Sequence, residues 1–81
     1  MNKIMYFSTS TCAPCKALKP IVQEVASELG VQVEYIDAQQ SPLTDTFRVT
    51  AVPTVIVFHK GQPAKRHTGM ATKQQIKSLF I

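Results

Sequence analysis

The sequence contains no tryptophan, only two cysteines and three glycines, and no long apolar run. Two cysteines are too few for the disulfide framework of a small secreted scaffold. No segment approaches the roughly 18 consecutive apolar residues of a membrane-spanning helix, and the early apolar run at residues 4–7 is too short for the core of a secretory signal. These shortages favour a protein of the reducing cytoplasm that does not enter a membrane. In that compartment a close cysteine pair is more often catalytic or metal-binding than structural.

Acidic residues are also scarce. The chain has five Asp and Glu and nine Lys and Arg, which gives a net charge of +4. The basic residues are scattered and do not interleave with aromatic side chains, so we expect no nucleic-acid site. The positive surface instead favours acidic protein partners. With 81 residues, 44% apolar and 17% charged, the chain is predicted to be globular. We expect one domain, residues 1–81, that acts as a monomer.

The first half of the chain predicts a strand, a long helix and a second strand. Residues 4–7 are continuously apolar, as in a strand buried on both faces. Apolar side chains then recur at helical spacing, at Ala17, Leu18, Ile21, Val22, Val25, Ala26 and Leu29. Pro14 suits the first turn of this helix, Pro20 predicts a kink in its middle, and Gly30 ends it. Residues 31–37 alternate as a strand, which the intervening helix should place parallel to the first.

The second half predicts a short helix, a hairpin and a last helix. The short helix begins at residue 41 or 42 and ends at 48, and residues 54–60 form the strongest predicted strand. A turn leads to a strand at residues 63–68, which Pro63 marks as an edge strand. Thr72 and Gln75 match a capping box before a helix that should bury Ile76, Leu79 and Phe80. The order β-α-β-α-β-β-α indicates a small α/β layered fold with a four-stranded mixed sheet flanked by helices.

Both cysteines lie where the first strand meets the long helix, in the stretch "TSTCAPCKALKP". A helix N-terminus offers free N–H groups and the positive end of the helix dipole, and both favour a thiolate. Such a position can lower a cysteine pKa from about 8.5 to about 3.5–7.5. Cys12 should be the more exposed and acidic thiol, and Cys15, one turn further on, the more buried. This asymmetry suits an attacking Cys12 and a resolving Cys15.

A metal site is the main alternative for the cysteine pair. Zinc usually takes four ligands in two close pairs. The only histidines, His59 and His67, are eight residues apart and far downstream of the cysteines. We therefore expect strand residues rather than ligands at these positions, and no bound metal. An inert pair is a further alternative.

Several motifs together resemble the thioredoxin superfamily in a minimal form, without the N-terminal strand and helix of full thioredoxins. They are Cys12-Ala13-Pro14-Cys15-Lys16, the mid-helix Pro20, Val52-Pro53-Thr54 before a strand, Gly61 in the hairpin and Gly69 before the last helix. The resemblance implies a cis peptide bond before Pro53 beside the cysteines. It also implies a substrate groove formed by Pro14, Val52, Pro53 and Gly69, in which the backbone of Val52 pairs with an extended segment.

The chain departs from the superfamily pattern beside the cysteines. Thr11 and Ser8 stand where thioredoxins carry tryptophan, and Tyr6 stands where they carry a buried acid. That acid helps to deprotonate the resolving cysteine, whereas a phenol, with a usual pKa near 10, does not accept this proton readily. We expect Tyr6 to be a core aromatic residue, with a hydroxyl free to hydrogen-bond near Cys15. Water or a neighbouring carboxylate must then take the proton.

The resemblance implies a thiol–disulfide oxidoreductase that reduces protein disulfides without a cofactor beyond its own Cys12–Cys15 disulfide. Its partners would be disulfide-containing proteins, with ribonucleotide reductase as a client by analogy, and a flavin-dependent thioredoxin reductase as the electron donor. A glutaredoxin-like, glutathione-dependent enzyme is one alternative, but Gly69-Met70-Ala71 replaces the Gly-Gly and acidic residue that hold glutathione. A non-catalytic binding module of the same fold is the other.

Overall fold

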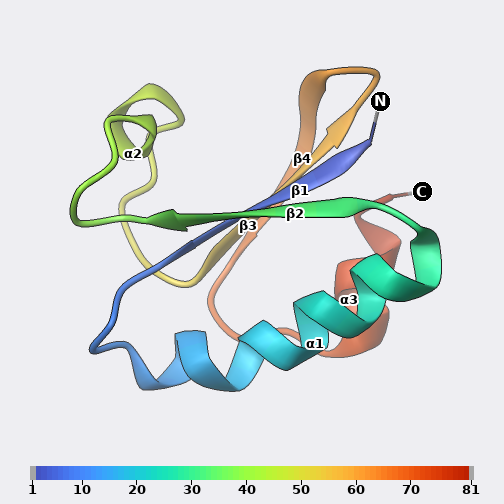
Figure 1. The fold of residues 1–81 in the computed structure, drawn as a ribbon, viewed down its shortest axis with the longest axis horizontal. Coiled ribbons are helices and arrows are strands. Elements are labelled where there is room, and N and C mark those ends of the chain that lie inside the picture. The colour runs from blue at the N-terminus through green and yellow to red at the C-terminus, as the bar shows by residue number, and fades with distance from the viewer. Residues whose placement is uncertain (1, 81) are drawn as a thin grey trace.

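The computed structural model describes residues 2–80 as a sheet with helices packed against it (Figure 1). In chain order the elements are β1 (Lys3–Ser8), α1 (Ala13–Leu29), β2 (Gln32–Asp37), α2 (Leu43–Thr46), β3 (Thr54–His59), β4 (Gln62–Thr68) and α3 (Lys73–Ser78). This order confirms the predicted β-α-β-α-β-β-α arrangement. The strand boundaries differ from the predicted ones by at most one residue and those of the short helix by one or two, which is the usual uncertainty of element ends.

The four strands form one mixed sheet in the order β2-β1-β3-β4. β1 pairs with β2 in parallel, and the hairpin strands β3 and β4 are antiparallel to their neighbours. The helix α1 between them returns the chain to the starting end of the sheet, which explains why the first two strands are parallel. Pro63 lies in the edge strand β4, as predicted, and the register of β4 against β3 shifts between Val57 and Phe58.

The sheet carries an apolar cluster on each face, because side chains of β1 alternate between the two. Ile4 and Tyr6 point into the cluster that α1 and α3 cover through Leu18 and Ile76. The opposite cluster consists of Met5, Phe7, Ile36, Val49, Ile56 and Phe58. Phe47, which follows α2, packs against this second cluster with edge-to-face contacts to Phe7 and Phe58. β1 is therefore buried on both faces, as its continuous apolar run predicts.

The helix ends follow the sequence signals. Cys12 is the N-cap of α1, and Gly30 closes the helix in the left-handed region with a φ of 68°. Thr72 and Gln75 form the predicted capping box at the start of α3. The helix α1 continues through Pro20 without interruption. The kink expected at Pro20 stays a prediction.

Two details of the predicted core and the predicted length of the second helix differ from the structure. Ala17 and Leu29 belong to the apolar stripe of α1 but are exposed, Leu29 by 43%. Leu79 and Phe80 are only half-buried, because α3 ends at Ser78 and both residues follow it. The second helix is a single turn, shorter than predicted. Across residues 2–80, no helix has the length and apolar character needed to cross a membrane.

Candidate functional site: a disulfide at a helix N-terminus

Cys12 and Cys15 form a disulfide at the junction of β1 and α1, with their Cα atoms 5.2 Å apart. Cys12 has an extended backbone, with φ of −92° and ψ of 104°, and Pro14 lies in the first turn of the helix. The Cys12 carbonyl accepts a hydrogen bond from the Lys16 N–H at 3.2 Å, which starts the helical ladder. The disulfide thus closes the first helical turn at its solvent-facing end.

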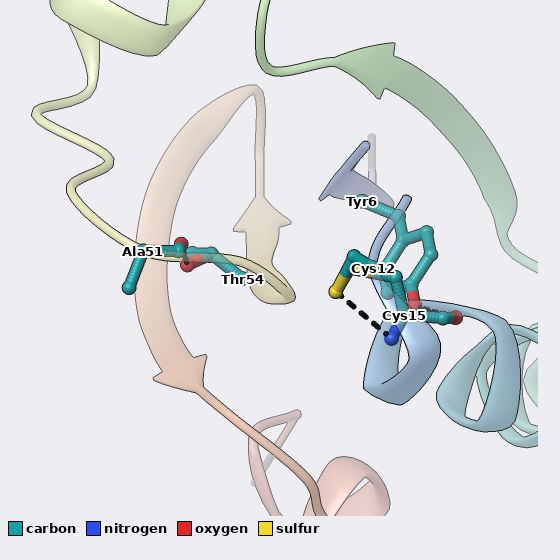
Figure 2. Close-up of a disulfide and its surroundings, with 5 residues drawn as sticks. All are labelled: Tyr6, Cys12, Cys15, Ala51 and Thr54. Atoms are coloured by element: carbon teal, nitrogen blue, oxygen red, sulfur yellow. Dashed lines mark hydrogen bonds between the residues drawn. A yellow bond between two sulfur atoms is a disulfide. The ribbon is translucent and has the colours of Figure 1, made fainter. Parts of the chain in front are cut away.

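The two sulfur atoms have different surroundings. The Cys12 sulfur accepts a hydrogen bond from the backbone N–H of Cys15 at 3.2 Å, as the dashed line in Figure 2 shows. Cys12 is partly exposed, whereas Cys15 is only 2% exposed. The first turn of α1 contains no acidic residue that would oppose a negative charge on Cys12. The predicted difference in burial is confirmed, and the N–H aimed at Cys12 favours its thiolate once the disulfide is opened.

A turn that contains a cis Val52–Pro53 peptide bond lies at the same end of the sheet. The register that pairs Phe7 with Thr54 sets this turn beside the residues that follow β1. The Pro53 carbonyl accepts a hydrogen bond from the Gly69 N–H at 2.8 Å, which fixes the loop after β4 to the turn. Gly69 has a φ of 93°, a conformation that favours glycine. The cis bond that the resemblance implies is confirmed.

The side chain of Thr54 stabilises the turn that contains Pro53. Its hydroxyl donates to the Ala51 carbonyl at 2.7 Å and lies 3.3 Å from the Thr68 hydroxyl. Figure 2 shows Ala51 and Thr54 on the segment that faces the cysteine pair. The sequence analysis missed this threonine pair, although a buried threonine directly after a predicted cis-proline is a signal for it. Val52, Pro53 and Gly69 therefore lie on turns at one end of the sheet, and Pro14 lies in the first turn of α1 at the same end.

Tyr6 fills the position where an acid was expected. Its side chain is 1% exposed, and its hydroxyl donates to the backbone carbonyl oxygen of Cys15 at 2.5 Å. Burial, and secondarily the neighbouring Tyr35, raise the pKa of Tyr6 to about 12. Tyr6 is therefore a core aromatic residue with its hydroxyl beside Cys15, as predicted. It holds its proton at neutral pH.

A cavity of about 400 Å³ lies next to the disulfide, between α1 and the ends of β1 and β2. Cys15, Tyr6 and Asp37 are among the residues that line it. The sequence analysis did not single out Asp37. Its position is nevertheless predictable, because the carboxyl ends of neighbouring parallel strands meet at one edge of a sheet, and Ser8 and Asp37 are partners in the register.

The two histidines lie on strands, and one of them contacts the loop residue Met70. His59 and His67 are strand residues of β3 and β4, as predicted. His67 Nε2 donates to the Met70 carbonyl oxygen at 2.9 Å, and the Met70 side chain is 48% exposed. Among residues 2–80, no three His, Cys, Asp or Glu side chains gather in a way that would hold a metal ion.

Nearly the whole chain is similar in sequence to known proteins. The family model described as Thioredoxin matches residues 2–81. A thioredoxin of Mycolicibacterium smegmatis is 36% identical over 72 residues, which are 83% of this chain and 64% of that protein. A bifunctional thioredoxin reductase/thioredoxin of Mycobacterium leprae is 39% identical over 70 residues, which are 83% of this chain and 15% of that protein. The chain therefore spans less than two thirds of the length of these relatives.

Among solved structures, thioredoxin 1 from Thermosipho africanus superimposes with a TM-score of 0.86 at 30% sequence identity. The match covers 96% of this chain and 89% of that one. It includes the four-stranded sheet and the helices that the sequence predicts. The fold, the cysteine pair at the helix N-terminus and the family match together show that this chain belongs to the thioredoxin family.

Proposed function

We propose that this protein is a thiol–disulfide oxidoreductase that reduces protein disulfides through the Cys12/Cys15 dithiol. One observation carries the proposal: a partly exposed cysteine caps a helix and receives an N–H, while its partner is 2% exposed. An exposed, stabilised thiolate is the nucleophile that disulfide exchange needs. A buried second thiol is protected from clients and meets only the mixed disulfide on Cys12.

The reaction proceeds in two exchange steps. The Cys12 thiolate attacks one sulfur of the client disulfide, which forms a mixed disulfide and releases the other client sulfur as a thiolate. Cys15 then loses its proton and attacks the Cys12 sulfur. The Cys12–Cys15 disulfide forms, the bond to the client breaks, and the second client sulfur leaves. The client gains two electrons and the protein loses two.

Pro14, Val52, Pro53 and Gly69 are proposed to bind the client. Their arrangement supports this role, because the Gly69 N–H to Pro53 carbonyl bond joins the two loops into one surface. Val52 is half-buried and lies two residues before Thr54, the first residue of β3, so its backbone lies outside the ladder between β1 and β3. An extended client segment can pair with such a backbone as an added strand does.

The proposed partners and compartment are supported by the family and by composition. A thioredoxin reductase is proposed as the electron donor, and the fusion of both activities in the relative from Mycobacterium leprae supports it. Ribonucleotide reductase is one proposed client among disulfide-containing proteins. With two cysteines and a net charge of +4, the chain is proposed to work as a single-domain monomer that carries electrons in the cytoplasm, without a cofactor or metal.

Reduction of insulin disulfides, with dithiothreitol as the donor, tests the activity. We expect wild-type protein to accelerate precipitation of the insulin chains, and Cys12→Ser to abolish the acceleration. Cys15→Ser should instead accumulate a mixed disulfide with the client, visible by mass spectrometry. Equal rates for wild type and Cys12→Ser would rule out the proposed function and leave a binding module.

The direction of electron flow is measured by equilibration in glutathione redox buffers. A reductant should have a potential near the thioredoxin value of about −270 mV, whereas an oxidant lies near about −120 mV. We expect the reducing value. A potential at the oxidising end would reassign the protein to disulfide formation.

A further inference from the structure

The cavity beside the disulfide brings titratable side chains and room for solvent next to Cys15. Resting on the function proposed above, we propose that Asp37 is the general base that takes the proton of Cys15 during the second exchange step, acting through water in this cavity. The role needs a proton acceptor near Cys15, because a thiol must become a thiolate before it attacks the mixed disulfide.

Tyr6 does not fill this role, although its hydroxyl contacts the backbone of Cys15. Its hydroxyl already donates to the Cys15 carbonyl oxygen. Burial raises the pKa of Tyr6 to about 12, so it remains protonated wherever the enzyme works. The phenol fixes the position of the Cys15 backbone and leaves the proton transfer to another group.

Five titratable side chains besides Cys15 itself line the cavity. From β1, α1 and β2 they are Tyr6, Lys16, Lys19, Tyr35 and Asp37. Phenols and ammonium groups hold their protons at neutral pH, whereas a carboxylate is ionised and can accept one. The Lys19 ammonium lies over the Tyr35 ring, 5.1 Å from its centroid, and keeps positive charge at the mouth of the cavity. Asp37 is the one carboxylate in this lining.

Asp37 is held in place by the turn that follows β2. Its Oδ1 accepts a hydrogen bond from the Gln39 N–H at 2.9 Å. Among residues 2–80 no hydrogen bond or ion pair engages the other carboxylate oxygen, Oδ2, which is therefore available to water. The parallel register sets Asp37 beside Ser8, at the end of β1 that leads to the cysteines.

The cavity has room and polar groups for the relay. At about 400 Å³ it has room for several waters, since one water takes up about 30 Å³ of liquid. The hydroxyls of Ser8, Thr9 and Ser10 line it as well and give such waters partners. In the step itself, the Cys15 proton passes through water to Asp37, and the Cys15 sulfur attacks Cys12. The client thiolate that leaves is then protonated by solvent, and Asp37 returns its proton to solvent.

A coloured aromatic disulfide separates the two exchange steps in a stopped-flow experiment. Attack by Cys12 of the reduced protein releases one coloured thiolate, and resolution by Cys15 releases the second. Asp37→Asn retains an oxygen for the Gln39 N–H, so it removes the base and keeps the turn. Asp45→Asn is the matched control, because Asp45 is an exposed acid in α2 outside the cavity lining, and its loss changes net charge equally.

We expect Asp37→Asn to leave the first phase unchanged and to slow the second by about 100-fold at pH 7, the lower end of what general bases contribute. The difference in second-phase rate between wild type and Asp37→Asn should decrease as the pH rises, because hydroxide then replaces the base. Asp37→Glu should recover part of the rate, and Asp45→Asn should match wild type. The second phase should show a larger solvent deuterium isotope effect in wild type than in Asp37→Asn.

The outcomes separate this assignment from the proposed function. If wild-type protein shows neither phase, the oxidoreductase function itself fails. If both phases occur and Asp37→Asn resolves as fast as Asp45→Asn, Asp37 is not the base. Equal slowing of both phases in Asp37→Asn also overturns the assignment, because it indicates an effect on the helix end rather than on the proton of Cys15.

Discussion

The hydrogen bond from the Tyr6 hydroxyl to the Cys15 carbonyl connects the central strand to the helix that carries the disulfide. Tyr6→Phe removes this bond and keeps the ring, including its edge-to-face contact with Tyr35 at a centroid distance of 6.3 Å. A carbonyl in the first turn of a helix also accepts from the N–H four residues later. The carbonyl therefore remains bonded, and the cost is that of one hydrogen bond, about 0.5–1.5 kcal/mol.

Urea unfolding of the oxidised protein measures this loss. With a slope of about 1 kcal/mol per molar urea for so small a chain, the midpoint should fall by about 0.5–1.5 M. Tyr35→Phe is the matched control, because Tyr35 is 47% exposed and its substitution should change stability by less than about 0.5 kcal/mol. An unchanged midpoint in Tyr6→Phe would show that the bond contributes nothing, and a loss above about 3 kcal/mol would show that the ring itself moves.

The difference in stability between wild type and Tyr6→Phe should also depend on pH. The pKa of Tyr6 is raised to about 12 by burial and by Tyr35, so the folded protein binds this proton more tightly than the unfolded chain does. Its stabilising effect is complete below about pH 10, the usual phenol value, and is lost as the pH rises toward 12. Wild type should therefore lose its advantage over Tyr6→Phe across that window. A constant difference from pH 8 to pH 12 would contradict the proposed burial of a neutral phenol.

Substitutions at three further positions test the packing and the helix termini. Ile76→Ala, at a fully buried position of α3, should cost about 2–5 kcal/mol in denaturant unfolding, and a cost below about 1 kcal/mol would contradict its place in the core. Thr72→Ala removes the capping box and should cost about 1 kcal/mol, whereas Thr72→Ser should be close to wild type; equal losses would show that the hydroxyl is not the cap. Hydrogen bonds from Lys73 and Lys77 lower the pKa of Glu28, so its contribution is present at neutral pH and lost as the pH falls below about 4. Melting temperatures of wild type and Glu28→Gln should therefore converge at low pH and in high salt, and a difference that persists under both conditions would exclude an ionic origin.

Sequence patterns predicted the elements well and the surface of the helices less well. The continuous run at residues 4–7, the proline of the edge strand and the capping box each reflect a local physical constraint that holds in any context. The stripe of α1 failed at Ala17 and Leu29. Ala17 lies about 100° around the helix from the buried Leu18, at the margin of the stripe, and Leu29 is the last residue of the helix. Helical spacing gives the direction of a side chain, but only the extent of the partner layer decides whether it is buried.

The site, too, has features that the sequence predicts and features that it does not. The spacing of Cys12 and Cys15 and the helix behind them are visible in the sequence, and so is the contrast in burial that follows from one helical turn. The hydrogen bond from Tyr6 depends on how closely β1 approaches α1, and the cavity depends on how β1 and β2 diverge from that helix. Both geometries result from packing between segments far apart in the sequence. The family resemblance places the Tyr6 hydroxyl near Cys15, but no local pattern predicts its carbonyl partner or the cavity.

The substitution of an acid by Tyr6 separates two tasks that one buried carboxylate would otherwise combine. A carboxylate at this position can bond to nearby donors and also accept a proton. The Tyr6 phenol serves only the structural task, because it donates to the Cys15 carbonyl and keeps its proton. The acceptor must then come from a neighbouring strand, and the end of β2 is the nearest one whose register brings a carboxylate, Asp37, beside β1. It follows that restoring an acid with Tyr6→Asp in the Asp37→Asn protein should recover the resolving step, even as the loss of the buried ring lowers stability. A failure to recover that step in a folded double variant would show that proximity of an acid alone does not set the rate.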